Sequence, residues 1–356
     1  MKRFWLTAIF AFLCLSLLFI SCDNPLEPDN GDDVFEILFT DPAGYEDLMD
    51  RATELIGGAE QSIYVATYLF ELTEISEALV EAHNAGVDVR VVCERENYDD
   101  DPQNCFYEME NAGIQVVPDN GGGAMHNKFI IFDEEIVWAG SSNLTYNGFH
   151  LNCNNTVIIR SISVADEFLH EFSQMYSGSF QGAKTSNGVE EVSVGDGSVA
   201  VIFGPQESPQ SRIIDEIENA DSVIKFCIYA FTVDAIADAF IDAKNRGVQV
   251  TGIFDNLQID ETPTTFYDLQ AAGVDVYEST APYAFHHKFI IIDPDENNAT
   301  VITSSGNWSN NGMFNNDENF VIIQSEIVAE DFSNEFARWQ VALFLSHLES
   351  ITLNYE

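Results

Sequence analysis

The stretch that decides the fold reads His126-Asn127-Lys128-Phe-Ile-Ile-Phe-Asp133, and it recurs as His286-His287-Lys288-Phe-Ile-Ile-Ile-Asp293. Each copy has the form His-x-Lys-x4-Asp and enters an apolar run that is typical of a buried strand. Because alternate side chains of a strand share one face, each histidine should point the same way as its lysine. A group that can attack or transfer a proton would then lie beside a fixed cation, which is the pairing that phosphoryl chemistry requires.

The composition makes these two lysines conspicuous. The chain has 14 Lys and Arg against 59 Asp and Glu, for a formal net charge of −45. Lys128 and Lys288 are two of only six lysines, and they occupy the same place in the two copies of one motif. Binding along a nucleic-acid backbone depends on Lys and Arg side chains that release counterions. The acidity therefore makes nucleic acid an unlikely partner.

The first 21 residues are predicted to be a signal peptide. A basic start, Lys2-Arg3, precedes a largely apolar run over 4–20, and Ser21-Cys22 follows. This ending resembles the lipoprotein box of bacteria, which implies that Cys22 is lipidated and that the body is anchored to a membrane of the cell envelope. Cleavage without lipidation, giving a secreted protein, and an uncleaved membrane anchor are the alternatives. Residues 22–34 are acidic and contain proline, so we expect a tether.

Four further cysteines would lie in the exported body. Cys93 and Cys105 flank a polar stretch and could form a disulfide in an oxidising compartment. Cys227 lies within an apolar run, and we expect it to be a small residue of the core.

The rest of the chain is an internal repeat of one structural unit. The apolar runs over 61–70 and 221–231 are each followed by a helical pattern, and Gly86 and Gly247 stand where those helices should end. Alternating strands and helices predict an α/β fold of two similar halves, each a mostly parallel sheet flanked by helices. We expect the halves, 35–180 and 200–346, to be related by a pseudo-two-fold axis and to close one active site between them. A Gly/Ser-rich linker over 181–199 would join them, and 347–356 would form a tail.

Short polar side chains follow each motif. Ser141 and Asn143 come soon after Asp133, and Ser305 and Asn307 come after Asp293. Hydroxyl and amide groups near a His-Lys pair suit the oxygens of a phosphate. For the serines, ordinary turn chemistry is the competing interpretation.

The pattern His-x-Lys-x4-Asp-x6-Gly-Ser-x-Asn resembles that of the phospholipase D superfamily, over about residues 36–340. The resemblance implies that one histidine attacks phosphorus while the other protonates the leaving alcohol, without a metal or other cofactor. It implies that the phosphate oxygens are held by Lys128, Lys288, Asn143 and Asn307. It also implies that Asp133 and Asp293 support the local structure. The second copy departs from the pattern, because Ser304-Ser305-Gly306-Asn307 replaces Gly-Ser-x-Asn.

Members of this superfamily often place a carboxylate downstream to orient each histidine. The second half has Glu318 in that place, whereas the first half has Asn154. A carboxylate favours a charged imidazolium and an amide does not. We therefore expect neutral His126 to be the nucleophile and protonated His286, oriented by Glu318, to be the general acid, with exchange of the two roles as the alternative.

A metal site is the competing interpretation of the polar cluster. The histidines and aspartates of the two motifs could serve as ligands, but the adjacent lysines would repel a cation. The predicted function is a phosphodiesterase that releases phospholipid head groups. The alternatives are a nuclease of the same superfamily, a phosphatidyl transferase, and a non-catalytic lipoprotein that binds lipids or anions. The sequence indicates no oligomeric state.

Overall fold

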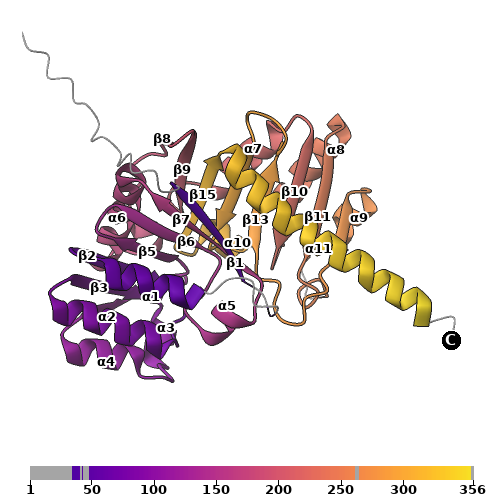
Figure 1. Ribbon diagram of the computed structural model, residues 1–356. Coiled ribbons are helices and arrows are strands. Elements are labelled where there is room, and N and C mark those ends of the chain that lie inside the picture. The colour runs from indigo at the N-terminus through magenta and orange to yellow at the C-terminus, as the bar shows by residue number, and fades with distance from the viewer. Residues whose placement is uncertain (1–33, 41, 43–47, 261–263, 354–356) are drawn as a thin grey trace, which may run out of the picture. The chain divides into compact units, whose positions relative to one another are not determined.

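The computed structural model describes residues 34–40, 42, 48–260 and 264–353. The predicted signal peptide, Cys22 and the tether up to residue 33 lie outside the described residues. The described residues belong to one compact unit that begins at Asp32, and its elements are labelled in Figure 1.

The first half is built on a mixed sheet. Among the described residues this sheet has seven strands, in the order β1 (Phe35–Thr40), β7 (Asn154–Arg160), β6 (Ile136–Gly140), β5 (Lys128–Phe132), β2 (Ser62–Thr67), β3 (Asp88–Cys93) and β4 (Gln115–Pro118). Only β2, β3 and β4 pair in parallel, and the other neighbours are antiparallel.

The second half repeats this arrangement. Its eight described strands follow the order β12 (Asp275–Glu278), β11 (Gln249–Phe254), β10 (Val223–Ile228), β13 (Lys288–Ile292), β14 (Thr300–Ser304), β15 (Glu318–Gln324), β9 (Gly197–Gly204) and β8 (Glu191–Val194). Again only the first three strands are parallel to one another.

The expectation of mostly parallel sheets is therefore wrong, although the α/β class and the two similar halves are confirmed. The reason lies just after the motif strand. Asp133 and Glu134 take positive φ values of 52° and 59° and turn the chain straight from β5 into β6. A tight turn of this kind joins antiparallel strands, whereas a parallel neighbour would need a long crossover connection.

Helices cover both sheets. In the first half α1 (Leu48–Gly58), α2 (Thr73–Ala85) and α4 (Cys105–Ala112) pack on one face, and in the second half α7 (Pro209–Glu218), α8 (Asp234–Arg246) and α9 (Phe266–Ala271) do the same. Gly86 and Gly247 end α2 and α8 in the left-handed conformation, as predicted. Short helices α3 (Arg95–Asp99), α5 (Tyr146–His150) and α10 (Asn310–Phe314) lie in loops that follow strands.

The two halves share a core. Helix α6 (Ile162–Tyr176) of the first half and α11 (Glu326–Leu353) of the second contribute to one cluster of buried residues together with both motif strands. Phe129 of β5 packs on Phe168 of α6, and Phe289 of β13 packs on Phe332 of α11. In Figure 1 the yellow helix α11 runs across the strands of the second sheet. This shared core fixes the two motif strands relative to each other.

Several boundaries differ from the sequence prediction. The expected linker, 181–199, contains a short helix η1 (Gln181–Ala183) and strand β8, which pairs with β9 at the edge of the second sheet. The expected tail continues α11 as far as Leu353. Cys93 and Cys105 are buried free thiols, so they form no disulfide, and Cys227 is a core residue as predicted. In the part of the chain that the structure describes, no helix has the length and apolarity needed to cross a membrane.

Candidate active site

The two motif histidines lie where the halves meet. Each stands two residues before its strand, since β5 begins at Lys128 and β13 at Lys288. The backbone N–H of His126 donates to the carbonyl of Asp317 in the other half at 2.9 Å. Reciprocally, the N–H of Cys153 donates to the carbonyl of Ala284, two residues before His286, at 2.9 Å. The main chain of one half therefore holds the histidine loop of the other.

The residue that orients each histidine comes from the opposite half. Glu318, the first residue of β15, accepts a hydrogen bond from Nδ1 of His126 at 2.8 Å. Asn154, the first residue of β7, lies 2.9 Å from Nδ1 of His286 through its Oδ1. The expectation that Glu318 orients His286 is therefore wrong. Each half supplies the partner of the other half's histidine, because the start of its last strand crosses the interface.

His126 is held in one tautomer. Glu318 accepts the Nδ1–H, and Nζ of Lys128 lies 3.2 Å from Nε2, to which it can donate. Nε2 therefore carries the lone pair. Burial lowers the pKa of His126, Glu318 partly opposes this, and the charge of Lys128 lowers the pKa further. The ring is therefore neutral near pH 7, with its lone pair at Nε2.

His286 has a different electrostatic environment. The Nδ2 of Asn154 donates to the carbonyl of Gly148 at 2.9 Å, which leaves Oδ1 facing the imidazole. Burial and the charges of Lys288 and Lys128 hold the pKa of His286 well below its usual value. Because its partner is an amide, no adjacent carboxylate offsets these effects. Before an anion binds, His286 is neutral as well.

The motif lysines are buried beside the histidines. Nζ of Lys128 donates to the carbonyl of His126 at 3.0 Å, and Nζ of Lys288 donates to that of His286 at 2.9 Å. Burial lowers the pKa of Lys128 to about 7, against the opposing effect of Glu318. Burial and the charge of Lys128 lower the pKa of Lys288 well below its usual value. Because the charge of Lys128 acts on Lys288, an anion bound beside both amines would stabilise their charged forms.

Two tyrosines that the sequence reasoning missed complete this symmetric arrangement. The ring of Tyr68 lies 4.6 Å from that of His126, and the ring of Tyr229 lies 4.8 Å from that of His286, measured between centroids. The same rings lie 5.3 Å from Nζ of Lys128 and 5.2 Å from Nζ of Lys288. Tyr68 directly follows β2 and Tyr229 directly follows β10, and this recurrence at matching places was the signal available in the sequence.

The serines do not face the site as phosphate ligands. The hydroxyl of Ser305 donates to Glu318 at 2.5 Å and accepts the N–H of Asn319 at 3.0 Å. The hydroxyl of Ser141 likewise donates to Oδ1 of Asn154 at 2.9 Å. Both serines are fully buried. The expectation that they bind phosphate is therefore wrong, because both hydroxyls hold the groups that orient the histidines.

The two asparagines of the motifs each keep one side-chain oxygen without a partner in the described chain. Asn143 and Asn307 are half-buried, and the Oδ1 atom of each is inaccessible and has no hydrogen-bond partner among the described residues. Asn307 lines a cavity of about 990 Å³ together with His126 and Tyr68. Their predicted role in holding phosphate oxygens stays a prediction.

The motif aspartates lie at the far end of their strands. The carboxylate of Asp133 accepts the N–H groups of Gln61 and Ser62 at 2.6 and 2.9 Å. Asp293 does the same for Ser222 and Val223 at 2.7 and 2.9 Å. These contacts fix the turns that lead into β2 and β10, so the aspartates support local structure, as expected, and do not take part in the chemistry.

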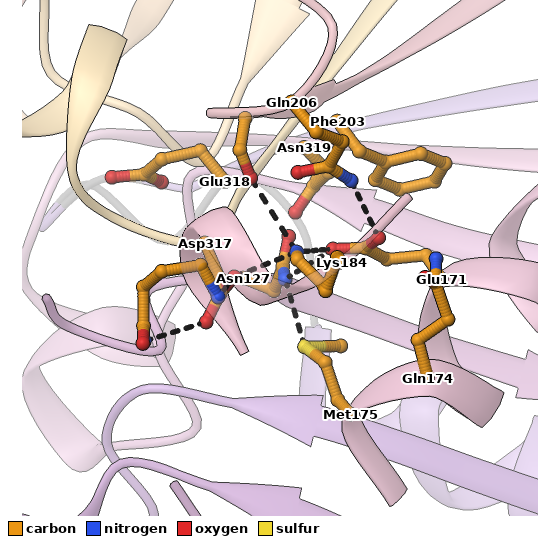
Figure 2. A network of polar contacts seen from close by, with 12 residues as sticks. Asn127, Glu171, Gln174, Met175, Lys184, Phe203, Gln206, Asp317, Glu318 and Asn319 are labelled. Atoms are coloured by element: carbon orange, nitrogen blue, oxygen red, sulfur yellow. Dashed lines mark hydrogen bonds and ion pairs between the residues drawn. The ribbon is translucent and has the colours of Figure 1, made fainter. Parts of the chain in front are cut away.

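A buried ionic network includes Asp317, the residue before Glu318 (Figure 2). Lys184, in the expected linker, forms ion pairs with Glu171 of α6 and with Asp317, at 2.6 Å for the latter. Burial opposes the charge of Lys184, yet the two carboxylates outweigh it and raise its pKa. Asp317 immediately precedes Glu318, so Lys184 ties the first half to the segment that orients His126. Nothing in the sequence motif pointed to this residue.

The neighbour of each motif histidine joins these networks. Asn127 Nδ2 lies 3.5 Å from Glu171, and His287 lies 3.2 Å from Glu335 of α11. His287 is thus a buried structural residue and not part of the site. Across residues 34–40, 42, 48–260 and 264–353, no three or more His, Cys, Asp or Glu side chains form a group that could hold a metal ion.

Known proteins share this architecture. A family model described as "Cardiolipin synthase, PLD-like domain" matches residues 52–176 and 213–339. A phospholipase D of Rickettsia prowazekii is 33% identical over 151 residues, which cover 42% of this chain and 68% of that protein. A mitochondrial cardiolipin hydrolase of Xenopus tropicalis is 29% identical over 135 residues, covering 38% of this chain and 62% of that protein.

A solved structure extends the likeness to both halves. The crystal structure of phosphatidylserine synthase from Haemophilus influenzae superimposes with a TM-score of 0.65 over 86% of each chain, at 15% identity. At that identity the likeness concerns the fold. Each of the two segments that the family model matches contains one His-x-Lys motif.

Proposed function

The chain belongs to the phospholipase D-like family, and on this basis we propose that it is a phosphodiesterase that releases phospholipid head groups through a phosphohistidine. The observation that carries the proposal is the crossed arrangement of the two histidines. Glu318 binds Nδ1 of His126 and so places the lone pair at Nε2, which must exchange its contact with Lys128, 3.2 Å away, for the phosphorus atom. The imidazole of His286 contacts the side-chain amide of Asn154, and the pKa of His286 is lowered.

In the first step Nε2 of His126 attacks phosphorus, and the bond between phosphorus and the head-group oxygen breaks. His286, protonated in the complex with the anionic substrate, donates its proton to the leaving alcohol. The phosphorylated imidazole of His126 gains positive charge, which the carboxylate of Glu318 stabilises. This retains the predicted roles of the histidines, but the carboxylate supports the nucleophile and not the acid.

In the second step His286, now neutral, takes a proton from water, and the resulting hydroxide attacks phosphorus. The bond between phosphorus and Nε2 of His126 breaks, phosphatidic acid leaves, and both histidines return to their starting states. A histidine with a lowered pKa suits this sequence, because it is a strong acid when protonated. We assign Lys128, Lys288, Asn143 and Asn307 to the non-bridging oxygens, where developing charge needs cations and amide donors.

The surroundings of the cavity favour lipid over nucleic acid. Glu94, Glu96 and Asp99 line it together with a single arginine, Arg95, in a chain of net charge −45. A polyanion would have to approach through this field, whereas a zwitterionic lipid carries one phosphate and a compensating cation. The relatives named phospholipase D and cardiolipin hydrolase support a lipid substrate.

We also propose that Cys22 carries a lipid and anchors the body at the cell envelope. The support is the sequence of the first 22 residues alone. Labelling of cells with a radioactive or clickable fatty acid tests this, because a Cys22→Ser variant should lose the label and appear in the soluble fraction.

The function is tested by incubating the purified protein, in the presence of chelator, with phosphatidylcholine or phosphatidylethanolamine vesicles and, separately, with single-stranded DNA. Release of the head group, lost in both His126→Ala and His286→Ala, supports the phosphodiesterase. Adding a primary alcohol shows whether a phosphatidyl transferase is present, since the alcohol would then appear in the lipid product. DNA cleavage without lipid turnover would indicate a nuclease. No activity on any of these substrates would favour a binding protein.

A further inference from the structure

The end of α11 carries apolar side chains that nothing in the described chain covers. Val341, Phe344 and Leu345 are 57%, 61% and 53% exposed. Their spacing of three and four residues places them on one side of the helix. Residues 339–347 contain no Asp, Glu, Lys or Arg, in a chain that has 73 such residues in total. A helix face in water normally carries charged side chains, and this segment has none.

A groove continues this apolar face into the body. It has a volume of about 600 Å³ and lies between α11 and the last parallel strand of the second sheet. Phe266, Val276 and Tyr277 line it from one side, and Leu343 and Phe344 line it from α11. Phe344 therefore belongs both to the groove and to the exposed face. We call Val341, Phe344, Leu345 and this groove the α11 patch.

The α11 patch lies at the edge of the sheet that carries the candidate active site. Tyr277 and Glu278 stand at the carboxyl end of β12, which is parallel to β11 and β10. The loop 279–285 leaves from this end and leads directly to His286. Trp339 of α11 packs on Phe285 of that loop, with ring centroids 5.1 Å apart. In Figure 1 the last turns of α11 extend beyond the strands.

We propose that the α11 patch is a docking surface for a bilayer of zwitterionic phospholipid, which the apolar side chains enter. The inference rests on the proposed function and deepens it by naming the form in which the substrate is met. A lipid surface fits an apolar helix face at the edge of the sheet that carries His286, beside a groove whose one carboxylate among the described residues is Glu278. A second copy of the chain fits less well, because each copy carries a net charge of −45 and the copies repel each other.

The test uses the chain from Asp32 onward. Every described helix and strand and all three hydrophobic clusters lie within this part, so it contains the complete fold. It also lacks the apolar stretch 4–20, which would bind lipid by itself. The variant is Phe344→Ser with Leu345→Ser. The matched control is Ile327→Ser, which removes a 68% exposed apolar side chain near the other end of the same helix.

Two measurements are made on each variant: co-sedimentation with phosphatidylcholine vesicles, and turnover of a short-chain phosphatidylcholine kept below its micelle concentration. We expect the double variant to bind vesicles at least about tenfold more weakly, because two large apolar side chains no longer leave water. Binding by the parent and by Ile327→Ser should be equal and should not weaken between about 0.05 and 0.5 M salt. Turnover of the dispersed lipid should be the same in all three.

Unchanged vesicle binding by the double variant would overturn the proposal. So would a change in the monomer–dimer equilibrium of the parent that only the double variant abolishes, because the patch would then be an interface between copies. Loss of turnover of the dispersed lipid in the double variant would also overturn it, since the residues would then serve the catalytic site. If no lipid is hydrolysed by any variant while vesicle binding depends on the patch, the proposed function fails and the docking surface stands.

Discussion

The carboxylate of Glu318, in the second half, accepts a hydrogen bond at 2.8 Å from Nδ1 of His126, in the first half. The mirror contact, from Asn154 to His286, has an amide in place of the carboxylate. One site thus contains two histidines with the same geometry and different electrostatics. In the proposed mechanism, this asymmetry separates the nucleophile from the general acid in a chain whose halves are otherwise alike.

Removing the charge from Glu318 tests the first of these contacts. Glu318→Gln keeps a hydrogen-bond acceptor for His126 but no longer stabilises the positive charge that forms on its ring. We expect kcat to fall by about 10²- to 10³-fold with little change in KM, as when one preorganised electrostatic contact is lost. Steady-state kinetics on dispersed short-chain lipid measure this. A fall confined to KM would contradict the role of Glu318.

Placing a charge at Asn154 tests the second contact through pH. Burial and the neighbouring lysines lower the pKa of His286 in the parent, and a carboxylate at 154 would raise it. Because the acid must be protonated, activity is lost as pH rises through that pKa. We therefore expect Asn154→Asp to move the alkaline limb of the kcat/KM profile to higher pH by about one unit or more.

The control for this prediction is thermal melting, since Asn154→Asp also loses the Nδ2 donor to the carbonyl of Gly148. A folded variant whose alkaline limb stays in place would show that His286 is not the acid. A limb that moves to lower pH would contradict the sign of the electrostatic effect.

The buried serines should influence catalysis without binding substrate. Ser305→Ala removes the hydroxyl that donates to Glu318 at 2.5 Å. The loosened carboxylate then orients His126 less well, and we expect kcat to fall by about tenfold. KM should stay within about twofold of the parent value. A large rise in KM with an unchanged kcat would instead indicate that the serine binds the substrate phosphate.

Lys184 lies in a connecting segment, yet we expect its side chain to contribute strongly to the free energy of unfolding. Lys184→Met leaves Glu171 and Asp317 as buried carboxylates without their cation. Breaking a buried pair in this way costs about 3–5 kcal/mol in the free energy of unfolding. Urea unfolding at pH 7 measures the loss.

Lys244→Met is the matched control for that experiment. Lys244 is half-buried, and its Nζ donates a 3.3 Å hydrogen bond to the carbonyl of Ala272. We expect its loss to cost about 1 kcal/mol or less. Equal effects of the two substitutions would show that the Lys184 network contributes nothing beyond an ordinary contact.

The features that could be predicted from the sequence are those that the repeated motif carries. The doubled His-x-Lys-x4-Asp pattern predicted the two halves and the shared site, and the family resemblance that it carries implied the structural role of Asp133 and Asp293. It could not predict that Glu318 orients His126, because that contact joins the two halves and its residues are 192 positions apart in the sequence. For the same reason, the sequence did not indicate the role of Lys184.

The sheet prediction failed for a physical reason as well. Apolar runs such as 128–132 look the same in parallel and antiparallel sheets when both faces are buried, so hydrophobic pattern alone does not distinguish them. The turn at Asp133 and Glu134 decides the direction of the next strand, and both residues adopt positive φ without being glycine. Residues of this kind give a weak turn signal.

The most direct test of the mechanism is to trap and locate the covalent intermediate. A p-nitrophenyl phosphodiester has a leaving group that needs no general acid, so His286→Ala should still be phosphorylated but should lack the base that activates water. We predict a burst of about one nitrophenolate per chain, and mass spectrometry after alkaline quenching should place the added group on His126. No burst in His286→Ala, or a group located on His286 in the His126→Ala variant, would contradict the assignment of His126 as the nucleophile.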